Sequence, residues 1–518
     1  MSSSSINPII PGFAPDPSII LLDGTFFLVN STFHMFPGLP IYASKDLITW
    51  KHIGNAIHRQ SQLSLKFSLT RLEEKDSAGD VMHNTGGLYA STIRHHNGTV
   101  YIVCTNVLHA DSWTQDQTEN FIVSTTDIWA GEWSDAILFS FRGIDPSIFF
   151  DSDGRSYIQG SAAPGPMTRI HLFEIDLRTG EKLSEEKEIW KGTGGEFPEG
   201  PHLYKKDEWY YVVISEGGTF EGHMITVARS RDIWGPYEAF ERNPILTARD
   251  TEEYIRATGH CDLMQDAQGQ WWGVCLGVRK ERGRYVMGRE TFLTPGEWAP
   301  GEWPKLSQVK MNPILPTGKE LSHTGSQPRL TASPMVDYLY IRDAQLDDHR
   351  FSRDGRTLTL IASRASFSQW QEPVTFVGKR QRTLEGTTSV LMHKPTKVTA
   401  GFIAGLAYYK DEHRYMKLFY DCSSSEIVFE VIVTSKQISK IVRQKVELER
   451  GVSFRLEYTE LLYKFSYSID SNSEGWISFE AQDTLDMTAP DFIGPVIGCF
   501  ANSAEGGGEA VFENLEVE

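Results

Sequence analysis

Long hydrophobic runs, a surplus of basic residues and a pattern of paired cysteines are all missing from this sequence of 518 residues. No run approaches the roughly 18 consecutive apolar residues that a membrane-spanning helix needs, so we expect no membrane partner. The formal net charge is −18, which disfavours nucleic acid and anionic lipid as partners because like charges repel. An uncharged substrate fits this composition better.

Cysteine is scarce and unpatterned, with five residues spread over the chain: Cys104, Cys261, Cys275, Cys422 and Cys499. An odd number at wide spacing is not typical of a disulfide framework or of a CxxC metal site, so we expect reduced, mostly buried thiols. The N-terminus lacks the basic start and apolar run of a secretory signal. We therefore expect a cytoplasmic protein, or a secreted one if a signal was trimmed.

Short runs of β-branched and aromatic residues recur between Gly, Asp, Asn and Pro turns, which is typical of an all-β chain. The clearest expected strands are 25–30, 99–105, 156–160, 209–215 and 270–276. A similar phrase, Ile-Tyr-Ala-Ser-Lys-Asp-Leu at 41–47, returns in altered form at 122–128 and 226–233, each time shortly before a tryptophan. Repeats of a few tens of residues indicate the blades of a β-propeller.

Strand patterning fades where the chain becomes rich in Pro, Gly and Ser, and it resumes afterwards without the blade phrase. We therefore expect a propeller over residues 1–305, a linker over 306–334 and a separate β-sandwich over 335–518.

Three acidic residues stand in turn-rich stretches: Asp16 in Phe-Ala-Pro-Asp-Pro-Ser-Ile, Asp145 in Gly-Ile-Asp-Pro-Ser-Ile and Glu199 in Phe-Pro-Glu-Gly-Pro-His. The two Asp-Pro-Ser-Ile copies lie 129 residues apart, which suggests equivalent positions in a repeated unit. A single Asp-Pro pair is usually an ordinary turn. Three such carboxyls together supply the acid and base that cleavage of a glycosidic bond requires, so they are our candidate catalytic residues.

With these motifs the sequence resembles glycoside hydrolase family 43, in particular its β-xylosidases and α-L-arabinofuranosidases that join a five-bladed propeller to a concanavalin-like β-sandwich. The resemblance spans most of the chain. Besides the three acidic stretches, it rests on Asn7-Pro8, Phe36-Pro-Gly-Leu-Pro-Ile41, Glu216-Gly-Gly-Thr219, Thr258-Gly-His260 and Gly288-Arg-Glu-Thr-Phe292.

The resemblance implies an inverting mechanism. In it Asp16 is the general base that activates a water, Glu199 is the general acid, and Asp145 positions Glu199 and raises its pKa. A nearby carboxylate has this effect because it penalises the ionised form.

The resemblance also implies the remaining site residues. Arg289 would bind substrate, although a structural salt bridge is the alternative. Phe33 would line the pocket, and Phe500, next to a glycine-rich stretch, would reach over it from the sandwich unless that stretch is a surface hairpin. His260 would lie at the propeller axis, near a structural Ca²⁺, unless it is an ordinary core histidine. No organic cofactor is expected.

The expected substrate is a xylo-oligosaccharide or arabinoxylan, from which single terminal β-1,4-linked xylose or α-L-arabinofuranose units are released. One alternative is an α-L-arabinofuranosidase that debranches arabinoxylan and has little xylosidase activity. The other is a carbohydrate-binding protein without catalysis, since propellers and sandwiches also serve as lectins. Departures from the commonest β-xylosidase pattern, such as Gly87-Leu-Tyr-Ala-Ser-Thr92, affect the choice of sugar. The sequence specifies neither that choice nor the number of subunits.

Overall fold

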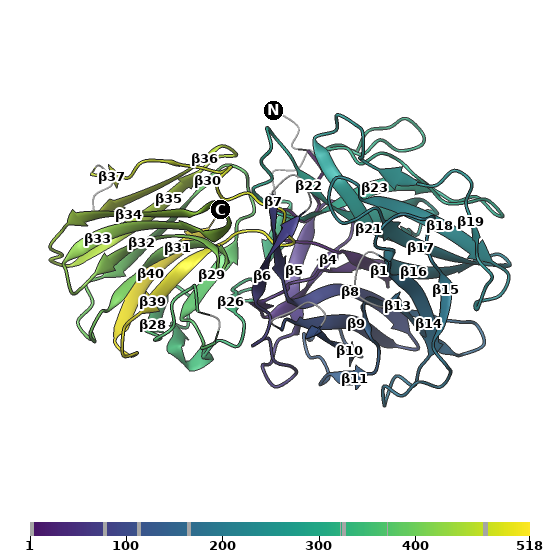
Figure 1. Ribbon diagram of the computed structural model, residues 1–518, viewed down its shortest axis with the longest axis horizontal. Helices are drawn as coiled ribbons and strands as arrows, with labels where there is room; N and C mark the ends of the chain where they lie inside the picture. The colour runs from purple at the N-terminus through teal and green to yellow at the C-terminus, as the bar shows by residue number, and fades with distance from the viewer. Residues whose placement is uncertain are drawn as a thin grey trace.

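The computed structural model describes residues 5–75, 80–110, 115–162, 167–321, 323, 328–369, 371–469 and 475–517. It is an all-β protein with two bodies, a propeller coloured purple to teal and a sandwich coloured green to yellow (Figure 1). Among the described residues no helix is long and apolar enough to cross a membrane. All five cysteines are free thiols, and four of them are buried.

Five antiparallel sheets form the propeller, as expected for five blades. Blade 1 contains β1 (Ser18–Leu22), β2 (Thr25–Val29), β4 (Gly38–Ser44) and β5 (Trp50–Ile57). Blade 2 contains β8 (Gly87–His96), β9 (Thr99–Leu108), β10 (Gln117–Thr125) and β11 (Ile137–Phe139). Blade 3 contains β12 (Gly143–Phe150), β13 (Ser156–Ala162), β14 (Arg169–Glu174) and β15 (Lys187–Trp190). Blade 4 contains β16 (Glu199–Lys206), β17 (Trp209–Glu216), β18 (Met224–Ser230), β19 (Glu238–Ala239) and β20 (Leu246–Thr247). Blade 5 contains β21 (Ile255–Gln265), β22 (Trp271–Arg279), β23 (Glu290–Glu297) and β24 (Lys305–Leu306).

The first strand of each blade is the innermost. Strands β1, β8, β12, β16 and β21 contact one another in that order, and β21 contacts β1 again, so the ring is closed. Middle strands such as β2 and β4 are buried along their whole length, because each blade packs between two neighbours. The expected strands at 25–30, 99–105, 156–160, 209–215 and 270–276 are thereby confirmed as β2, β9, β13, β17 and β22.

The ring closes through the N-terminal segment. The Asn7 side chain donates to the carbonyls of Leu293 and Lys310 and accepts from the Leu293 N–H, while the Ile9 N–H donates to the Thr291 carbonyl. Residues 7–10 are thus held against β23 of the last blade, before the chain enters blade 1.

The segment expected as a linker is attached to the propeller. Its strand β25 (Leu330–Ala332) pairs in parallel with β5 at the outer edge of blade 1. Beyond it, β26 (Tyr340–Ile341) pairs with β3 (Met35–Phe36), so the chain stays bonded to blade 1 as it enters the second domain.

Two packed sheets form the C-terminal sandwich. The first contains β27 (His349–Phe351), β28 (Thr357–Ile361), β40 (Glu509–Val517), β30 (Gly386–His393), β35 (Gly451–Tyr458), β36 (Leu462–Ser468), β37 (Ile477–Ser478) and β38 (Gln482–Asp483). The second contains β29 (Phe376–Arg380), β39 (Val496–Asn502), β31 (Ile403–Asp411), β32 (Arg414–Asp421), β33 (Glu426–Val433) and β34 (Ile438–Lys445). Single 3₁₀ turns occur at η2 (Leu346–Asp348) and η3 (Thr434–Lys436). Burial alternates along β35, which has one face in the core and one toward solvent.

A hairpin from the propeller contacts the sandwich directly. Strands β6 (Thr70–Lys75) and β7 (Asp80–Thr85) lie between the two bodies in Figure 1. The Thr70 N–H donates to the Glu412 carboxylate, and the His83 N–H donates to the Pro490 carbonyl. These bonds attach the segments around Glu412 and Pro490 of the sandwich to the propeller hairpin.

Candidate active site

Four of the five inner strands have an irregular register near their first residues: β8 between Leu88 and Ser91, β12 between Ile144 and Ser147, β16 between Glu199 and His202, and β21 between Arg256 and Asp262. Such bulges redirect side chains and are common beside functional sites. Several residues here adopt a positive φ without being glycine, among them Asp16 (48°), Asp145 (54°) and His260 (47°). The surrounding structure must stabilise this costly backbone, which is frequent at active sites.

The two Asp-Pro-Ser-Ile copies occupy equivalent places, as the repeat suggested. Asp16 lies two residues before β1, and Asp145 is the third residue of β12; both are buried. The serine of each copy points to the propeller axis, where Ser18 donates to Asp262 and Ser147 bonds to the His202 ring.

The three predicted carboxylates are brought together. Asp145 Oδ2 accepts the N–H of Gly200 at 3.0 Å, and Gly200 directly follows Glu199 in the chain. Asp16 Oδ2 accepts the Ser31 hydroxyl at 2.7 Å. Glu199 is largely buried, with 17% of its side chain exposed. The bond of Asp145 links the inner strands β12 and β16, the bond of Asp16 lies within blade 1, and Asp145 and Asp16 both act electrostatically on Glu199.

Two cationic or potentially cationic groups face the carboxylates. Arg289 Nη1 lies 3.9 Å from Asp16 Oδ1, and His260 Nδ1 lies 3.7 Å from the same oxygen. Arg289 is held in place by donating through Nη2 to the Thr219 hydroxyl. The predicted Arg289 is therefore buried beside the acidic cluster, and its guanidinium partly compensates the negative charge there.

The acidic cluster strongly shifts two pKa values. Burial raises the pKa of Glu199 well above its usual range, and the charge of Asp145 adds to this rise. Burial also raises the pKa of Asp145 to about 6; Asp16 contributes to the rise, while His260 and Arg289 oppose it. A carboxyl that stays protonated near neutral pH can act as a general acid.

Aromatic rings form a wall beside the carboxylates. Phe33 is buried, with ring centroids 5.0 Å from Tyr89 and 5.6 Å from Phe492. The Arg289 guanidinium lies 4.5 Å from the centre of the Phe492 ring and 5.9 Å from that of Phe220. Phe492 comes from the sandwich, so both domains build this wall.

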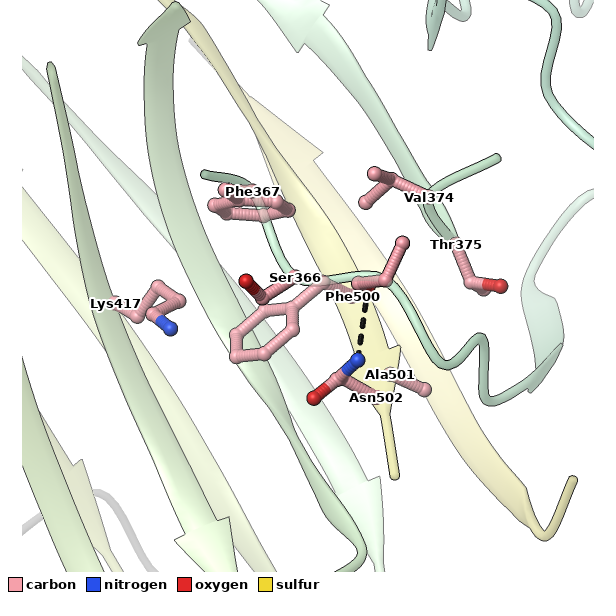
Figure 2. Close-up of a pocket in the computed structure, with 9 residues that line it drawn as sticks. Ser366, Phe367, Val374, Thr375, Lys417, Phe500, Ala501 and Asn502 are labelled. Carbon is pink, nitrogen blue, oxygen red and sulfur yellow. Dashed lines mark hydrogen bonds between the residues drawn. The ribbon is translucent and has the colours of Figure 1, made fainter. Parts of the chain in front are cut away.

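Phe500 has a different position from the one expected. It lies in β39 with 2% exposure, and its ring packs on Phe367 at 5.3 Å and on Phe419 at 6.0 Å. Figure 2 shows Phe500 beside Phe367, Val374 and Lys417 around a small hollow inside the sandwich sheet, and none of the three carboxylates is among the residues that line this hollow. Phe500 is buried in a hydrophobic cluster that also contains Phe13 and Phe33 of the propeller, on the face of β39 opposite the core between the two sandwich sheets. Phe492 is a sandwich residue that contacts Arg289.

Phe492 is held by a buried ionic cluster next to it in the chain. Asp491 accepts from Lys410 and from Arg414, each at 2.6 Å, and all three side chains are at most 1% exposed. Arg414 also donates to Asp411, which lies 3.3 Å from the ring of His83 in the propeller hairpin. The ionic cluster therefore links the position of Phe492 to the contact between the two domains.

An arginine occupies the propeller axis. Arg94 donates both terminal nitrogens to Asp262, at 2.7 and 2.9 Å, and Asp262 also accepts from Ser18 and from the Tyr204 hydroxyl. Arg94 Nη2 lies 3.2 Å from His202 Nδ1 as well. The positive charge at the propeller axis is therefore supplied by the Arg94 guanidinium.

These residues do not fit the calcium ion expected near His260. Calcium takes six to eight oxygen ligands, whereas the axial carboxylate of Asp262 is already engaged by Arg94. Over the part of the chain that the structure describes, no three His, Cys, Asp or Glu side chains are grouped to hold a metal. His260 instead packs against Gly200, where a Cβ would come within 2.9 Å of its ring.

Sequence reasoning missed three residues next to the carboxylates. Neither Phe492 nor Phe220 is among the candidate residues that the sequence offers. His223, with Nε2 at 3.7 Å from Glu199 Oε1, was not considered either. Only Glu216-Gly-Gly-Thr219, which closely precedes Phe220 and His223, marked this stretch as part of a site.

Comparisons with known proteins agree with this architecture. A family model described as "Glycosyl hydrolases family 43" matches residues 5–304, and one described as "Beta xylosidase C-terminal Concanavalin A-like domain" matches residues 333–518. A "Non-reducing end alpha-L-arabinofuranosidase" of Bacteroides ovatus is 31% identical over 97% of this chain and 92% of its own length. A "Xylan 1,3-beta-xylosidase" of a Vibrio species is 30% identical over 91% and 90%. The solved structure "Bacteroides ovatus Xyloglucan PUL GH43B" is 29% identical, covers 99% of this chain and 100% of its own, and superposes with a TM-score of 0.84.

Proposed function

This chain belongs to glycosyl hydrolase family 43, and we propose that it releases single terminal pentoses, xylose or L-arabinofuranose, from xylan-derived oligosaccharides. Its relatives carry names for both sugars, among them a "Xylosidase/arabinosidase" of Butyrivibrio fibrisolvens that is 31% identical over 96% of the chain. The observation that carries the proposal is the cluster of Asp16, Asp145 and Glu199, in which burial keeps the pKa of Glu199 high.

In this proposal Glu199 acts as the general acid. Its proton passes to the glycosidic oxygen as the bond from that oxygen to the anomeric carbon breaks. Asp16 acts as the general base and takes a proton from the water whose oxygen forms the new bond to the anomeric carbon. Attack on the face opposite the leaving group inverts the anomeric configuration.

Asp145 and Arg289 support these two groups. Asp145 holds the backbone N–H of Gly200, beside Glu199, and its charge opposes loss of the Glu199 proton. Arg289 compensates the charge of Asp16 and has its guanidinium beside the aromatic wall, where it can donate to sugar hydroxyls. The rings of Phe33 and Phe492 give that wall the apolar character on which a sugar face stacks.

The test is the initial rate on aryl β-xyloside and aryl α-L-arabinofuranoside for the wild type, Asp16→Asn and Glu199→Gln. Asp153→Asn, at an exposed turn, is the matched control. We expect both site variants to lose at least about a hundredfold and the control to lose nothing. Activity that is indifferent to both site variants would refute the assignment. Proton NMR of the first-formed sugar tests inversion, and retained configuration would contradict it.

The same assay tests the second candidate, an arabinofuranosidase with little xylosidase activity, for which the Bacteroides ovatus relative is the supporting observation. A rate on the arabinofuranoside that exceeds the xyloside rate by about a hundredfold or more would favour it. Comparable rates would favour a pocket that accepts both sugars.

A further inference from the structure

His223 is a buried histidine whose ring is fixed by its neighbours. It is 1% exposed and precedes β18 by one residue. Gly259 of β21 lies against the ring so closely that a Cβ there would fall 2.1 Å from a ring carbon. Only glycine at position 259 therefore leaves room for the ring in this position.

The carbonyl beside Nδ1 indicates which ring nitrogen of His223 carries the proton. His223 Nδ1 lies 3.3 Å from the carbonyl oxygen of Ala257, which can only accept a hydrogen bond. Ala257 sits in the register irregularity of β21 with a φ of 52°, a conformation that a residue with a Cβ adopts only under constraint. Burial lowers the pKa of His223 to about 3, so the ring is neutral at working pH. With the proton on Nδ1, Nε2 presents a bare lone pair.

The lone pair faces the general acid. Nε2 has no hydrogen-bond partner among the described residues, and it lies 3.7 Å from Glu199 Oε1. An ionised Glu199 would put a negative oxygen against this lone pair, whereas a protonated Glu199 has an O–H to donate. To form this hydrogen bond the two atoms must approach from 3.7 Å to the usual distance of about 2.8 Å.

We propose that His223 is a positioning residue that holds Glu199 in its protonated form, by accepting a hydrogen bond from the Glu199 carboxyl at Nε2. This inference rests on the proposed function of Glu199. In the free enzyme the proton is held toward His223; on substrate binding, the carboxyl presents it to the glycosidic oxygen. After that transfer, the lone pair disfavours the carboxylate and promotes reprotonation from solvent.

The other charged groups around Glu199 act alongside His223. Asp145 from β12 and Asp16 from the segment before β1 favour the protonated form, and Arg289, next to β23, favours the ionised form. His260 of β21 completes the titratable groups of this cluster through its contact with Asp16. Because these groups remain in place when His223 is replaced, the effect of the histidine can be measured separately.

The first experiment is the pH profile of kcat/KM for the wild type and His223→Phe, which keeps a ring of similar size and removes the lone pair. We expect the alkaline limb to move down by about one pH unit, the effect of losing one hydrogen bond to the neutral form. We also expect a larger loss on xylobiose than on a dinitrophenyl xyloside, whose leaving group needs little protonation. An unmoved alkaline limb would overturn the proposal. His52→Phe, a buried ring replacement in blade 1, is the control and should leave the limb in place.

A second experiment uses the wild-type chain and needs no activity. Nitrogen NMR of ¹⁵N-histidine-labelled protein, with His223 assigned by its loss in His223→Phe, reports which ring nitrogen carries the proton. The Nδ1–H tautomer supports the proposal and the Nε2–H tautomer overturns it. If the wild type hydrolyses no glycoside, the proposed function fails, but a ¹³C titration of the Glu199 carboxyl in both proteins still tests His223. An equal Glu199 pKa in the two would refute its role.

Discussion

The raised pKa of Asp145 predicts that ionisation of this buried carboxyl lowers the free energy of unfolding of the wild-type enzyme at neutral pH. Burial moves the pKa from 3.8 to about 6 in the folded protein. Below pH 3.8 the carboxyl is protonated in both the folded and unfolded states, so it costs nothing. Above pH 6 it is ionised in both, and the folded state bears the full penalty. At 1.36 kcal/mol per pKa unit, that penalty is about 3 kcal/mol.

Replacing Asp145 with asparagine should remove this penalty. The amide oxygen can still accept the Gly200 N–H, and a neutral side chain is cheaper to bury. For the roughly 300 residues of the propeller, an unfolding entropy of about 2.1 cal/mol/K per residue converts about 3 kcal/mol into a Tm increase of about 5 °C. We therefore expect Asp145→Asn to unfold at higher temperature than the wild type at pH 7.5 and to lose most of its glycosidase activity.

The assay is a thermal unfolding series from pH 3.5 to 8 on both proteins. The gain in Tm should be largest above pH 6 and should vanish near pH 3.8. A variant that is less stable than the wild type at pH 7.5 would refute the reasoning. A gain that stays constant over the whole pH range would refute it too, because the effect would not come from ionisation.

Three further predictions follow from the site and the axis. Phe492→Ala should raise KM about tenfold, a loss of about 1.4 kcal/mol of binding, with a smaller change in kcat; an unchanged KM would contradict a substrate contact. Asp262→Asn should destabilise the protein by about 3–5 kcal/mol in denaturant titrations, because it leaves the buried Arg94 charge without its partner, and a cost under about 1 kcal/mol would contradict this. Since Arg94 supplies the axial positive charge, EDTA should change neither Tm nor rate, and activity restored by added calcium after EDTA would disprove this expectation.

The sequence predicts a propeller and the main acidic cluster for identifiable reasons, and the family resemblance adds the number of five blades. Blade strands are short and rich in β-branched and aromatic residues. They are separated by turns such as Asp23-Gly24, in which both residues have a positive φ. Asp16 and Asp145 stand in near-identical phrases, so a shared phrase indicated a shared place in the ring. Local patterns of this kind are encoded over a few residues and can be recognised without the structure. The catalytic roles of these residues stay predictions.

The residues that sequence reasoning missed depend on contacts between distant segments. Phe492 belongs to the sandwich and reaches Arg289 only because the ionic cluster around Asp491 and the propeller hairpin hold it there. Arg94 lies 168 positions from Asp262, and no local motif indicates that the Arg94 side chain occupies the propeller axis, where a metal ion was expected. The resemblance, together with a nearby glycine-rich stretch, placed Phe500 over the pocket, but Phe500 lies in the regular strand β39 and is buried between the two domains.

The closure of the ring through Asn7 has a consequence for biosynthesis. Asn7 bonds to Leu293 across 286 positions, so during synthesis this segment waits for the last blade before it reaches its partners. At about 5–20 residues per second, that wait lasts on the order of 15–60 s. During it, blades 1 to 4 have an open edge, and contacts this distant in sequence form slowly. A nascent chain stalled before blade 5 should therefore be sensitive to proteases. A bulky fusion placed just before Ile6 would lie beside the contact between residues 7–10 and β23, which forms last.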